Sequence, residues 1–424
     1  MATVPVARRP SAADEPSAPA RNGWIALLSL ASLGLWMGYF GPLQVLLPDQ
    51  VEHIAGAGKT TALGVITAVG ALVAVLVGPI AGALSDATTA RLGRRRTWAA
   101  VGVVIGCGGL AFLSTQTTVT GVLIGWCIAQ AGLNIVQAGL SAVIPDRVPV
   151  RQRGLVSGWV GLTQSIGVVI AVLLVTTVVT GTVRGYLLIG VLVVVAVVPF
   201  VILSPDPPIG REDAPPFTIR SVFTAFRFSP RRYPDFAWAW GTRFLVQLGN
   251  AMATLYLLYF LRDEVRYEQL FPGRDAGEGL LILILIYTAA TLLTVVVGGV
   301  ISDRTGRRKP SVIVSGLVMA AAAALLTVWP TWTGAIIAAG VLGLGFGVYL
   351  SVDQALITQV LPTSVDRAKD LGIINIANSA PQVLGPACAA PIIAYLGGYT
   401  ALFAVVAIVT TAGSILVTRI RSVA

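Results

Sequence analysis

The feature that most constrains this chain is a series of apolar stretches, each long enough to cross a lipid bilayer. A helix needs about 20 apolar residues to span the hydrocarbon core. Twelve stretches qualify, at 24–47, 61–85, 97–115, 119–144, 153–180, 184–204, 234–262, 278–302, 310–330, 333–361, 371–396 and 399–419. Backbone groups in lipid must be hydrogen-bonded within the protein, which favours helices. The sequence therefore predicts an all-α membrane protein with twelve transmembrane helices.

Charged residues are scarce and lie mostly between the apolar stretches. They make up 11% of the 424 residues, against about 25% in soluble proteins. The net charge of +10 comes from short basic clusters, which favours a topology signal over nucleic-acid binding. With a cytoplasmic N-terminus, the outer loops hold Lys59, Arg184, Arg262, Arg266 and Arg274, Arg243 lies within a helix, and the remaining 23 of 29 basic residues lie inside. We expect a multi-pass protein of the plasma (cytoplasmic) membrane with both termini in the cytoplasm.

The remaining composition argues against a catalytic or metal-binding protein. The three cysteines lie inside apolar stretches, so we expect no disulfide and no metal site. The single histidine, His53, lies in a predicted loop, so no Ser/His/Asp set can form. The chain also lacks a complete phosphate-binding loop, which argues against ATP-driven pumping. We expect no cofactor and no enzymatic activity.

Matching residues recur at a constant spacing in the two halves. Asp86 and Asp303 each end the second stretch of a set of six and are 217 positions apart. Gln137 and Gln354, in the fourth stretch of each set, show the same offset of 217. The sequence therefore predicts a parallel duplication. Its expected parts are a disordered cytoplasmic tail at 1–23, a six-helix bundle at 24–204, a proline-rich cytoplasmic linker at 205–233 and a second six-helix bundle at 234–424.

A basic loop follows the second stretch of each set. In the second half its marked positions are Gly299, Asp303, Arg304, Gly306, Arg307 and Arg308. This pattern, the twelve stretches and the duplication resemble the major facilitator superfamily over essentially the whole chain after residue 23. The first copy keeps Asp86 but places four extra residues before Gly93. That longer form resembles the sucrose transporters and the related glycoside–cation symporters.

The resemblance implies a cytoplasmic gate. It implies that Asp86 meets the start of the eleventh helix and Asp303 the start of the fifth, which would hold the cytoplasmic side closed. A carboxylate can accept hydrogen bonds from arginines and face the positive N-terminus of a helix. The expected gate residues are Asp86, Gly93, Arg94, Arg95, Asp303, Arg304, Gly306, Arg307 and Arg308. The alternative is that both loops are basic only because they set the topology.

Polar residues recur on one face of several apolar stretches. Such faces avoid lipid, because unpaired polar groups are costly there. They either hold helices together or line a central, water-filled cavity. The candidates for substrate binding and coupling are Asn134, Gln137, Arg243, Gln247, Asn250, Asp353, Gln354, Asn378 and Gln382.

Arg243 and Asp353 are charged residues deep inside predicted helices. A charge at the bilayer centre costs about 2.5–3.5 kcal/mol on insertion scales. Arg243 lies eight residues after Asp235, and Asp353 lies eight residues before Leu361, each near an inner helix end. At about 1.5 Å per residue, both lie about 12 Å deep and could meet. The two would form either a structural ion pair or a switch, in which protonation of Asp353 frees Arg243.

These observations predict a secondary active transporter that moves a small polar solute by alternating access. Amides together with Trp36, Tyr39, Trp240 and Tyr256 would suit a neutral polyhydroxylated solute, so proton-coupled sugar or glycoside symport is the first interpretation. The first alternative is proton-antiport efflux of drugs or metabolites, and the second is a non-transporting membrane sensor. The expected partners are the solute, a coupling proton and the bilayer, with the protein a monomer.

Overall fold

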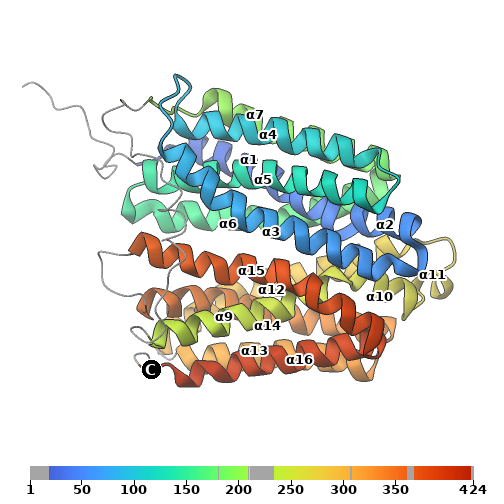
Figure 1. Cartoon of the computed structure of the whole chain (residues 1–424). Coiled ribbons are helices and arrows are strands. Elements are labelled where there is room, and N and C mark those ends of the chain that lie inside the picture. The colour runs from blue at the N-terminus through green and yellow to red at the C-terminus, as the bar shows by residue number, and fades with distance from the viewer. Residues whose placement is uncertain are drawn as a thin grey trace, which may run out of the picture.

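The computed structural model describes residues 19–179, 181–208, 210, 234–305, 308–360 and 367–421. In these ranges the regular secondary structure is helical throughout. The helices form two bundles that lie side by side, one from each half of the chain (Figure 1). The predicted fold class, an all-α protein of two helical bundles, is confirmed. The expected tail at 1–23 and linker at 205–233 fall largely outside the described residues.

The first bundle contains α1 to α7. α1 (Asn22–Gly41) continues through a π-helical segment, η1 (Pro42–Leu46), into the short helix α2 (Leu47–Ala55). After a 3-10 turn, η2 (Gly56–Gly58), the remaining helices are α3 (Lys59–Asp86), α4 (Arg94–Ser114), α5 (Val119–Arg147), α6 (Val150–Leu173) with its π-helical end η3 (Leu174–Val178), and α7 (Thr182–Leu203).

The second bundle contains α9 to α16. α9 (Pro234–Leu255) and α10 (Leu257–Asp263) are bent by 42° at the break between them. They are followed by α11 (Tyr267–Leu270), α12 (Ala276–Thr305), α13 (Arg308–Val328), α14 (Trp332–Val360), α15 (Arg367–Tyr395), α16 (Gly398–Leu416) and a 3-10 turn, η4 (Val417–Arg419).

The first helix is longer than its apolar pattern predicts. The apolar stretch ends at residue 47, whereas the helical conformation continues through α2 to Ala55. Pro48 stands in the first turn of α2, where a missing backbone N–H is best tolerated. α2 also buries Leu47 and Val51 against the bundle. His53, expected in a loop, therefore lies on α2.

Nine helical stretches of the described chain are long and apolar enough to cross a membrane, or ten if α9 and α10 form one span. One of the nine, Asn22–Asp86, runs through α1, α2 and α3. Large apolar side chains such as Val104, Ile202 and Ile408 are exposed, as expected for a surface that faces lipid. The protein is thus a multi-pass membrane protein, and the number of twelve spans remains a prediction.

Glycines let helices approach closely inside the first bundle. A Cβ placed on Gly132 of α5 would lie 2.1 Å from the backbone nitrogen of Gly106 on α4. Backbone contact of this kind is typical of helix packing in membranes. The hydrophobic effect does not drive association in lipid, and small residues allow the close packing that does. Between the bundles, α3 packs against α15 and α6 touches α12.

Candidate functional site

An aromatic–amide pair connects α1 and α5 in the first bundle. The hydroxyl of Tyr39 donates a hydrogen bond to Oε1 of Gln137 at 3.0 Å. Trp36 lies against the ring of Tyr39 with 5.7 Å between the centroids. One turn before Gln137, Nδ2 of Asn134 donates to Oε1 of Gln130 at 3.1 Å. Asn134 and Gln137 are half-buried, so these amides could exchange a protein partner for a hydroxylated solute.

A buried ion pair connects α9 and α14 in the second bundle. Nε of Arg243 lies 3.1 Å from Oδ2 of Asp353, and the side chains are 9% and 3% exposed. Tyr349, one turn before Asp353 on α14, is also buried. The two charges that the sequence places at equal depth do pair. The pair joins α9 to α14. Removing either partner would leave an uncompensated buried charge, which is strongly destabilising.

The structure describes the side chains of some of the other predicted site residues and not of the rest. Gln247 and Asn250 are half-buried and follow Arg243 at intervals of four and three residues, so the three share one face of α9. Gln382 is exposed on α15. The side chains of Gln354 and Asn378 lie outside the described part of the chain.

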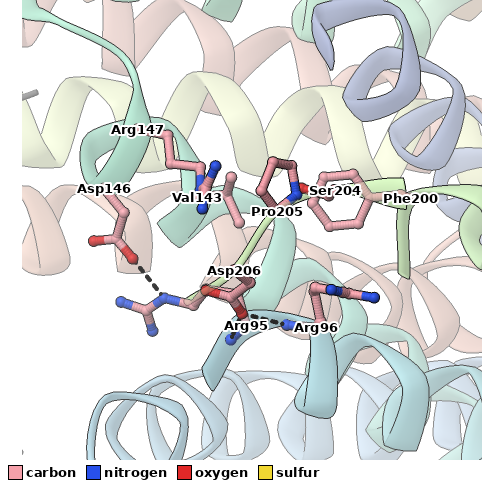
Figure 2. Close-up of a pocket in the computed structure, with 9 residues that line it drawn as sticks. All are labelled: Arg95, Arg96, Val143, Asp146, Arg147, Phe200, Ser204, Pro205 and Asp206. Atoms are coloured by element: carbon pink, nitrogen blue, oxygen red, sulfur yellow. Dashed lines mark hydrogen bonds and ion pairs between the residues drawn. The ribbon is translucent and has the colours of Figure 1, made fainter. Parts of the chain in front are cut away.

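Arg95 is the centre of an ion-pair group at the end of the first bundle where α3 ends and α4 begins. Its Nη2 lies 2.6 Å from Oδ1 of Asp86, and its Nε lies 2.8 Å from Oδ2 of Asp146 at the end of α5. Arg94 lies 2.9 Å from the same oxygen of Asp146. Arg95 is buried and also donates to the hydroxyl of Ser85. We call this end of the molecule, defined by these residues, the motif end. Figure 2 shows Arg95 and Asp146 of this group.

Asp206, just after α7, caps the N-terminus of α4. Its Oδ2 accepts hydrogen bonds from the backbone N–H groups of Arg95 at 2.7 Å and Arg96 at 3.0 Å. A carboxylate there satisfies unpaired donors and the helix dipole. Gly93 precedes α4 with a φ of 90°, and a Cβ on it would lie 2.3 Å from the carboxyl carbon of Asp206. Glycine at position 93 thus permits both the backbone conformation and the docking of Asp206. Figure 2 shows Asp206 beside Arg95 and Arg96.

At the opposite end of the molecule, Lys59 connects the two bundles. Its Nζ lies 2.7 Å from Oε1 of Glu52 on α2 and 2.7 Å from Oδ1 of Asp263 at the end of α10. The side chain of Lys59 is 14% exposed. Nζ also lies 4.6 Å from the centre of the Tyr259 ring, within cation–π range.

Arg262 of α10 makes the matching contacts from the second bundle. Its Nη2 lies 2.7 Å from Oδ1 of Asp49, and its Nη1 lies 2.6 Å from Oε2 of Glu52. Asp275, before α12, also lies 3.7 Å from Nη2 of Arg262. We call Asp49, Glu52, Lys59, Arg262 and Asp263 the interbundle cluster, and the end that carries it the latch end; in Figure 1 it is the end where α2, α10 and α11 are labelled.

Contact between α3 and α15 changes along their length. Gly64 and Gly82 of α3 are five turns apart at about 100° per residue, so they share one face. A Cβ on Gly64 would lie 2.5 Å from Cβ of Ala390 on α15. On Gly82 it would meet nothing within 4 Å in the described part of the chain. The two helices thus pack closely near the latch end. Toward the motif end their ribbons lie farther apart (Figure 1).

Comparison with known proteins decides the family. The model of the Major Facilitator Superfamily matches residues 25–281 and 273–423, which together cover nearly the whole chain. The chain belongs to the major facilitator superfamily. Membership in this superfamily indicates a transporter, not an enzyme. No curated protein sequence matches the chain.

Solved transporter structures share the superfamily fold with this chain at low sequence identity. The nucleoside transporter NupG is 14% identical with a TM-score of 0.73, over 94% of this chain and 98% of NupG. A POT family transporter in complex with a thioalcohol-conjugated peptide is 14% identical with a TM-score of 0.71, over 93% and 95%. The human organic anion transporter MFSD10 is 15% identical with a TM-score of 0.69, over 94% and 100%.

The structure describes the first copy of the basic motif more fully than the second. In the first copy, Asp86 pairs with Arg95 of its own bundle. Its expected partner, the start of α15, has side chains outside the described part. In the second copy, Arg308 is half-buried at the start of α13. The side chains of Asp303 and Arg304, and residues Gly306 and Arg307 altogether, lie outside the described residues, so the implied gate contacts remain predictions.

Several charged side chains of these two groups were not predicted from the sequence. Asp146 and Asp206 complete the motif end, and Asp49, Glu52 and Asp263 complete the interbundle cluster. A possible signal for Asp206 is an acidic residue just after a transmembrane helix, opposite a basic loop. The cluster offers no local signal, because its partners are about 200 positions apart and their pairing depends on how the bundles meet.

Proposed function

We propose that the protein is a secondary active transporter that carries a small polar solute across the plasma membrane by alternating access. The observation that carries this proposal is the unequal contact between the bundles. Ion pairs join them at the latch end, whereas the ribbons of α3 and α15 lie farther apart toward the motif end (Figure 1). In the proposed cycle, the contacts at the latch end close a central route on that side, and the solute reaches the route from the motif end.

The motif end is assigned to the cytoplasm. Arg94, Arg95, Arg96 and Arg147 gather there on the first bundle, and basic residues are retained on the cytoplasmic side of membrane proteins. Both termini are then cytoplasmic, and the protein acts as a monomer in the plasma membrane. The latch end faces outside, so the structure corresponds to a state closed to the outside.

We assign the solute to the neutral polyhydroxylated compounds, with a sugar or glycoside as the first choice. Tyr39, Gln137 and Asn134 in the first bundle, with Gln247 and Asn250 in the second, offer amide and hydroxyl groups that match several hydroxyls of a solute. Gln354, Asn378 and Gln382 complete this assignment from sequence. Among the similar structures, NupG is a nucleoside transporter, which is compatible with a polar solute.

Coupling to protons is assigned to Arg243 and Asp353. When Asp353 is ionised, the 3.1 Å ion pair holds α9 and α14 together. Protonation of Asp353 would cancel the attraction and free Arg243 to move or to bind the solute. A purely structural pair is the competing role, and the two roles predict different transport when both charges are removed together.

The double variant Arg243→Gln/Asp353→Asn separates these roles. It leaves no unpaired buried charge, so it should unfold close to the wild-type temperature, whereas either single variant should lose roughly 3 kcal/mol of stability. If the pair couples transport to protons, the double variant should equilibrate solute but fail to accumulate it in a proton gradient. Accumulation that still follows the gradient would assign the pair to structure alone.

The gate residues complete the proposed cycle at the cytoplasmic side. When the two bundles close at the motif end, the start of α15 would be faced by Asp86, Gly93, Arg94 and Arg95. Asp303 with Arg304, Gly306, Arg307 and Arg308 would face the start of α6. These contacts would replace the interbundle cluster as the latch in the state open to the outside.

Uptake into proteoliposomes tests the function directly. A panel of sugars, glycosides, nucleosides, peptides and organic anions is offered with an acidic exterior, with an acidic interior and without a gradient. The proposal predicts accumulation of a sugar or glycoside only with the acidic exterior. Accumulation only with an acidic interior would favour proton-antiport efflux. Failure of every solute to enter would contradict transport of these classes.

A further inference from the structure

In the first bundle, the corner where α7 ends beside the start of α4 contains its own anion. The side chain of Arg96 donates hydrogen bonds to the backbone oxygens of Val201 and Ile202 at the end of α7. Oδ2 of Asp206, which follows α7, accepts a hydrogen bond from the backbone N–H of Arg96 at 3.0 Å. The start of α4 and its arginine thus face a carboxylate that the chain itself supplies (Figure 2).

The corresponding corner of the second bundle carries basic residues instead. It lies where α16 and η4 pack against α13. Lys309 stands three residues after the second motif glycine, as Arg96 stands three residues after the first. The stretch 417–424, which follows α16, contains Arg419 and Arg421 and neither aspartate nor glutamate. This stretch therefore offers no counterpart of the carboxylate that completes the first corner.

Lys309 and Arg419 lie near each other at this second corner. Val417 of η4 and Val312 of α13 belong to one buried apolar cluster. Arg419 follows Val417 by two residues, and Lys309 precedes Val312 by three, or about one turn. Asp235 of α9 also reaches the corner, where its Oδ1 accepts a hydrogen bond from the backbone N–H of residue 421 at 3.0 Å. Basic side chains thus predominate, and an external anion would be attracted.

An apolar groove of about 530 Å³ runs between α13 and α16 beside this corner, within the range of about 300–1,000 Å³ typical of ligand pockets. Five of its nine lining residues are alanines, whose small side chains leave the space open. Along α16 it extends from Ile415 to Ala407, or about 12 Å. One leaflet contributes about 15 Å, half of the hydrocarbon core. The length of the groove therefore matches an acyl chain of the leaflet at the motif end.

The basic residues stand over the near end of the groove. Arg419 lies about one turn after Ile415 on α16, and Lys309 lies eleven residues, close to three full turns, before Ala320 on α13. Each basic residue thus shares a helix face with a lining residue. A phosphate at the corner and a chain in the groove can belong to one molecule.

We propose that this corner and groove bind an anionic phospholipid of the leaflet at the motif end. Its phosphate contacts Lys309 and Arg419, in the place that the carboxylate of Asp206 fills in the first bundle, and one acyl chain lies between α13 and α16. Basic pockets between transmembrane helices on the cytoplasmic side bind acidic lipid head groups. The site goes beyond the proposed transport, and its test needs neither solute nor proton gradient.

A second copy of the chain is the competing occupant of the groove. Two copies in one membrane share their orientation, so a two-fold axis along the membrane normal would bring Lys309 and Arg419 of both copies to the same depth. These like charges repel each other, whereas a lipid phosphate attracts them. The charge at the corner therefore favours the lipid.

Quenching of a fluorophore beside the groove tests the site in phosphatidylcholine nanodiscs. In a variant whose three native cysteines are replaced, bimane is attached at Ile408→Cys, an exposed position of the groove. Phosphatidylglycerol or phosphatidylcholine with brominated acyl chains is added at increasing mole fraction, and bromine quenches the fluorophore on contact. The control label is placed at Val191→Cys, which is exposed on α7, the corresponding helix of the first bundle.

At Ile408→Cys, brominated phosphatidylglycerol should reach half-maximal quenching at a mole fraction about 30-fold lower than brominated phosphatidylcholine, because two basic residues select its phosphate. At Val191→Cys the two lipids should quench alike. Equal quenching by both lipids at Ile408→Cys would overturn the site and assign the groove to bulk lipid. Quenching by neither lipid would also overturn it and indicate that a second copy covers the groove.

Three variants separate the head-group contacts from the chain contacts. Arg419→Gln should reduce the preference for phosphatidylglycerol roughly fivefold, and adding Lys309→Gln should abolish it. Arg91→Gln removes an exposed positive charge from the first bundle at the same end and should leave the preference unchanged. Equal effects of Arg91→Gln and Arg419→Gln would overturn the specific corner. Ala321→Phe fills the groove from an exposed position and should lower the maximal quenching, whereas unchanged quenching would place the chain elsewhere and overturn the groove.

Discussion

The two ends of the molecule use the same residue types in opposite ways. At the motif end, Arg95 contacts Asp86 and Asp146, and all three belong to the first bundle. At the latch end, Arg262 of the second bundle contacts Asp49 and Glu52 of the first. Pairs within one bundle can persist in every conformational state, so they stabilise the bundle without favouring a state. Pairs between bundles exist in one state only, so they shift the equilibrium between states.

The largest expected effect tests the motif end. Arg95→Gln leaves Asp146 with Arg94 alone and removes the 2.6 Å partner of Asp86. Because Arg95 is buried, the variant should lose roughly 2–3 kcal/mol of stability, measured as a lower unfolding temperature in detergent. Spin labels at Ala57 and Gln269, which are both exposed at the latch end, should report the same distances as in the wild type. A shift of those distances would show that Arg95 acts on the equilibrium between states.

The next effect measures the docking of Asp206. Gly93→Ala introduces both a strained φ of 90° and a clash with Asp206, whereas Gly181→Ala at a φ of 102° meets no atom within 4 Å in the described part. Backbone strain should cost about 1 kcal/mol at each position. The unfolding temperature of Gly93→Ala should therefore fall further than that of Gly181→Ala. Equal losses would mean that the contact with Asp206 adds nothing.

The smallest expected effect sharpens the latch end. Tyr259→Phe removes one hydrogen bond, to Pro48, and keeps the ring beside Lys59. A single neutral hydrogen bond contributes about 1 kcal/mol, so the ratio of molecules open to molecules closed at the latch end, measured with the same spin labels, should rise roughly fivefold. Tyr256→Phe, whose hydroxyl also contacts the first bundle at Thr60 over a longer 3.3 Å, should change the ratio less. A larger effect of Tyr256→Phe would mean that its longer hydrogen bond stabilises the closed latch end more than the hydrogen bond of Tyr259 does.

Much of the fold can be predicted from the sequence, because a lipid bilayer requires long apolar helices. The length of the apolar stretches predicts the helices, and the constant offset between Asp86 and Asp303 predicts the duplication. The pairing of Arg243 with Asp353 was also predictable, since a buried charge needs a partner at the same depth. The pattern missed the helical extension through α2, because Asp49 and Glu52 end the apolar stretch without ending the helix.

The interbundle cluster could not be predicted in the same way. Lys59 and Asp263 are 204 positions apart, and each also belongs to an outer region where solvated charges are common. Their pairing depends on which bundle faces meet and in which conformational state. The same applies to Asp206, whose role as the cap of α4 depends on where the chain leaves α7. Local spacing does not contain this information.

In the proposed state, the bundles are closed at the latch end and open at the motif end. Cysteine at position 82 tests it most directly, because a side chain there meets no atom within 4 Å in the described part of the chain. In a variant whose three native cysteines are replaced, Gly82→Cys is exposed to a membrane-impermeant maleimide from either side of oriented vesicles. We expect rapid labelling from the cytoplasmic side and none from outside. Labelling from outside alone, or from neither side, would contradict it.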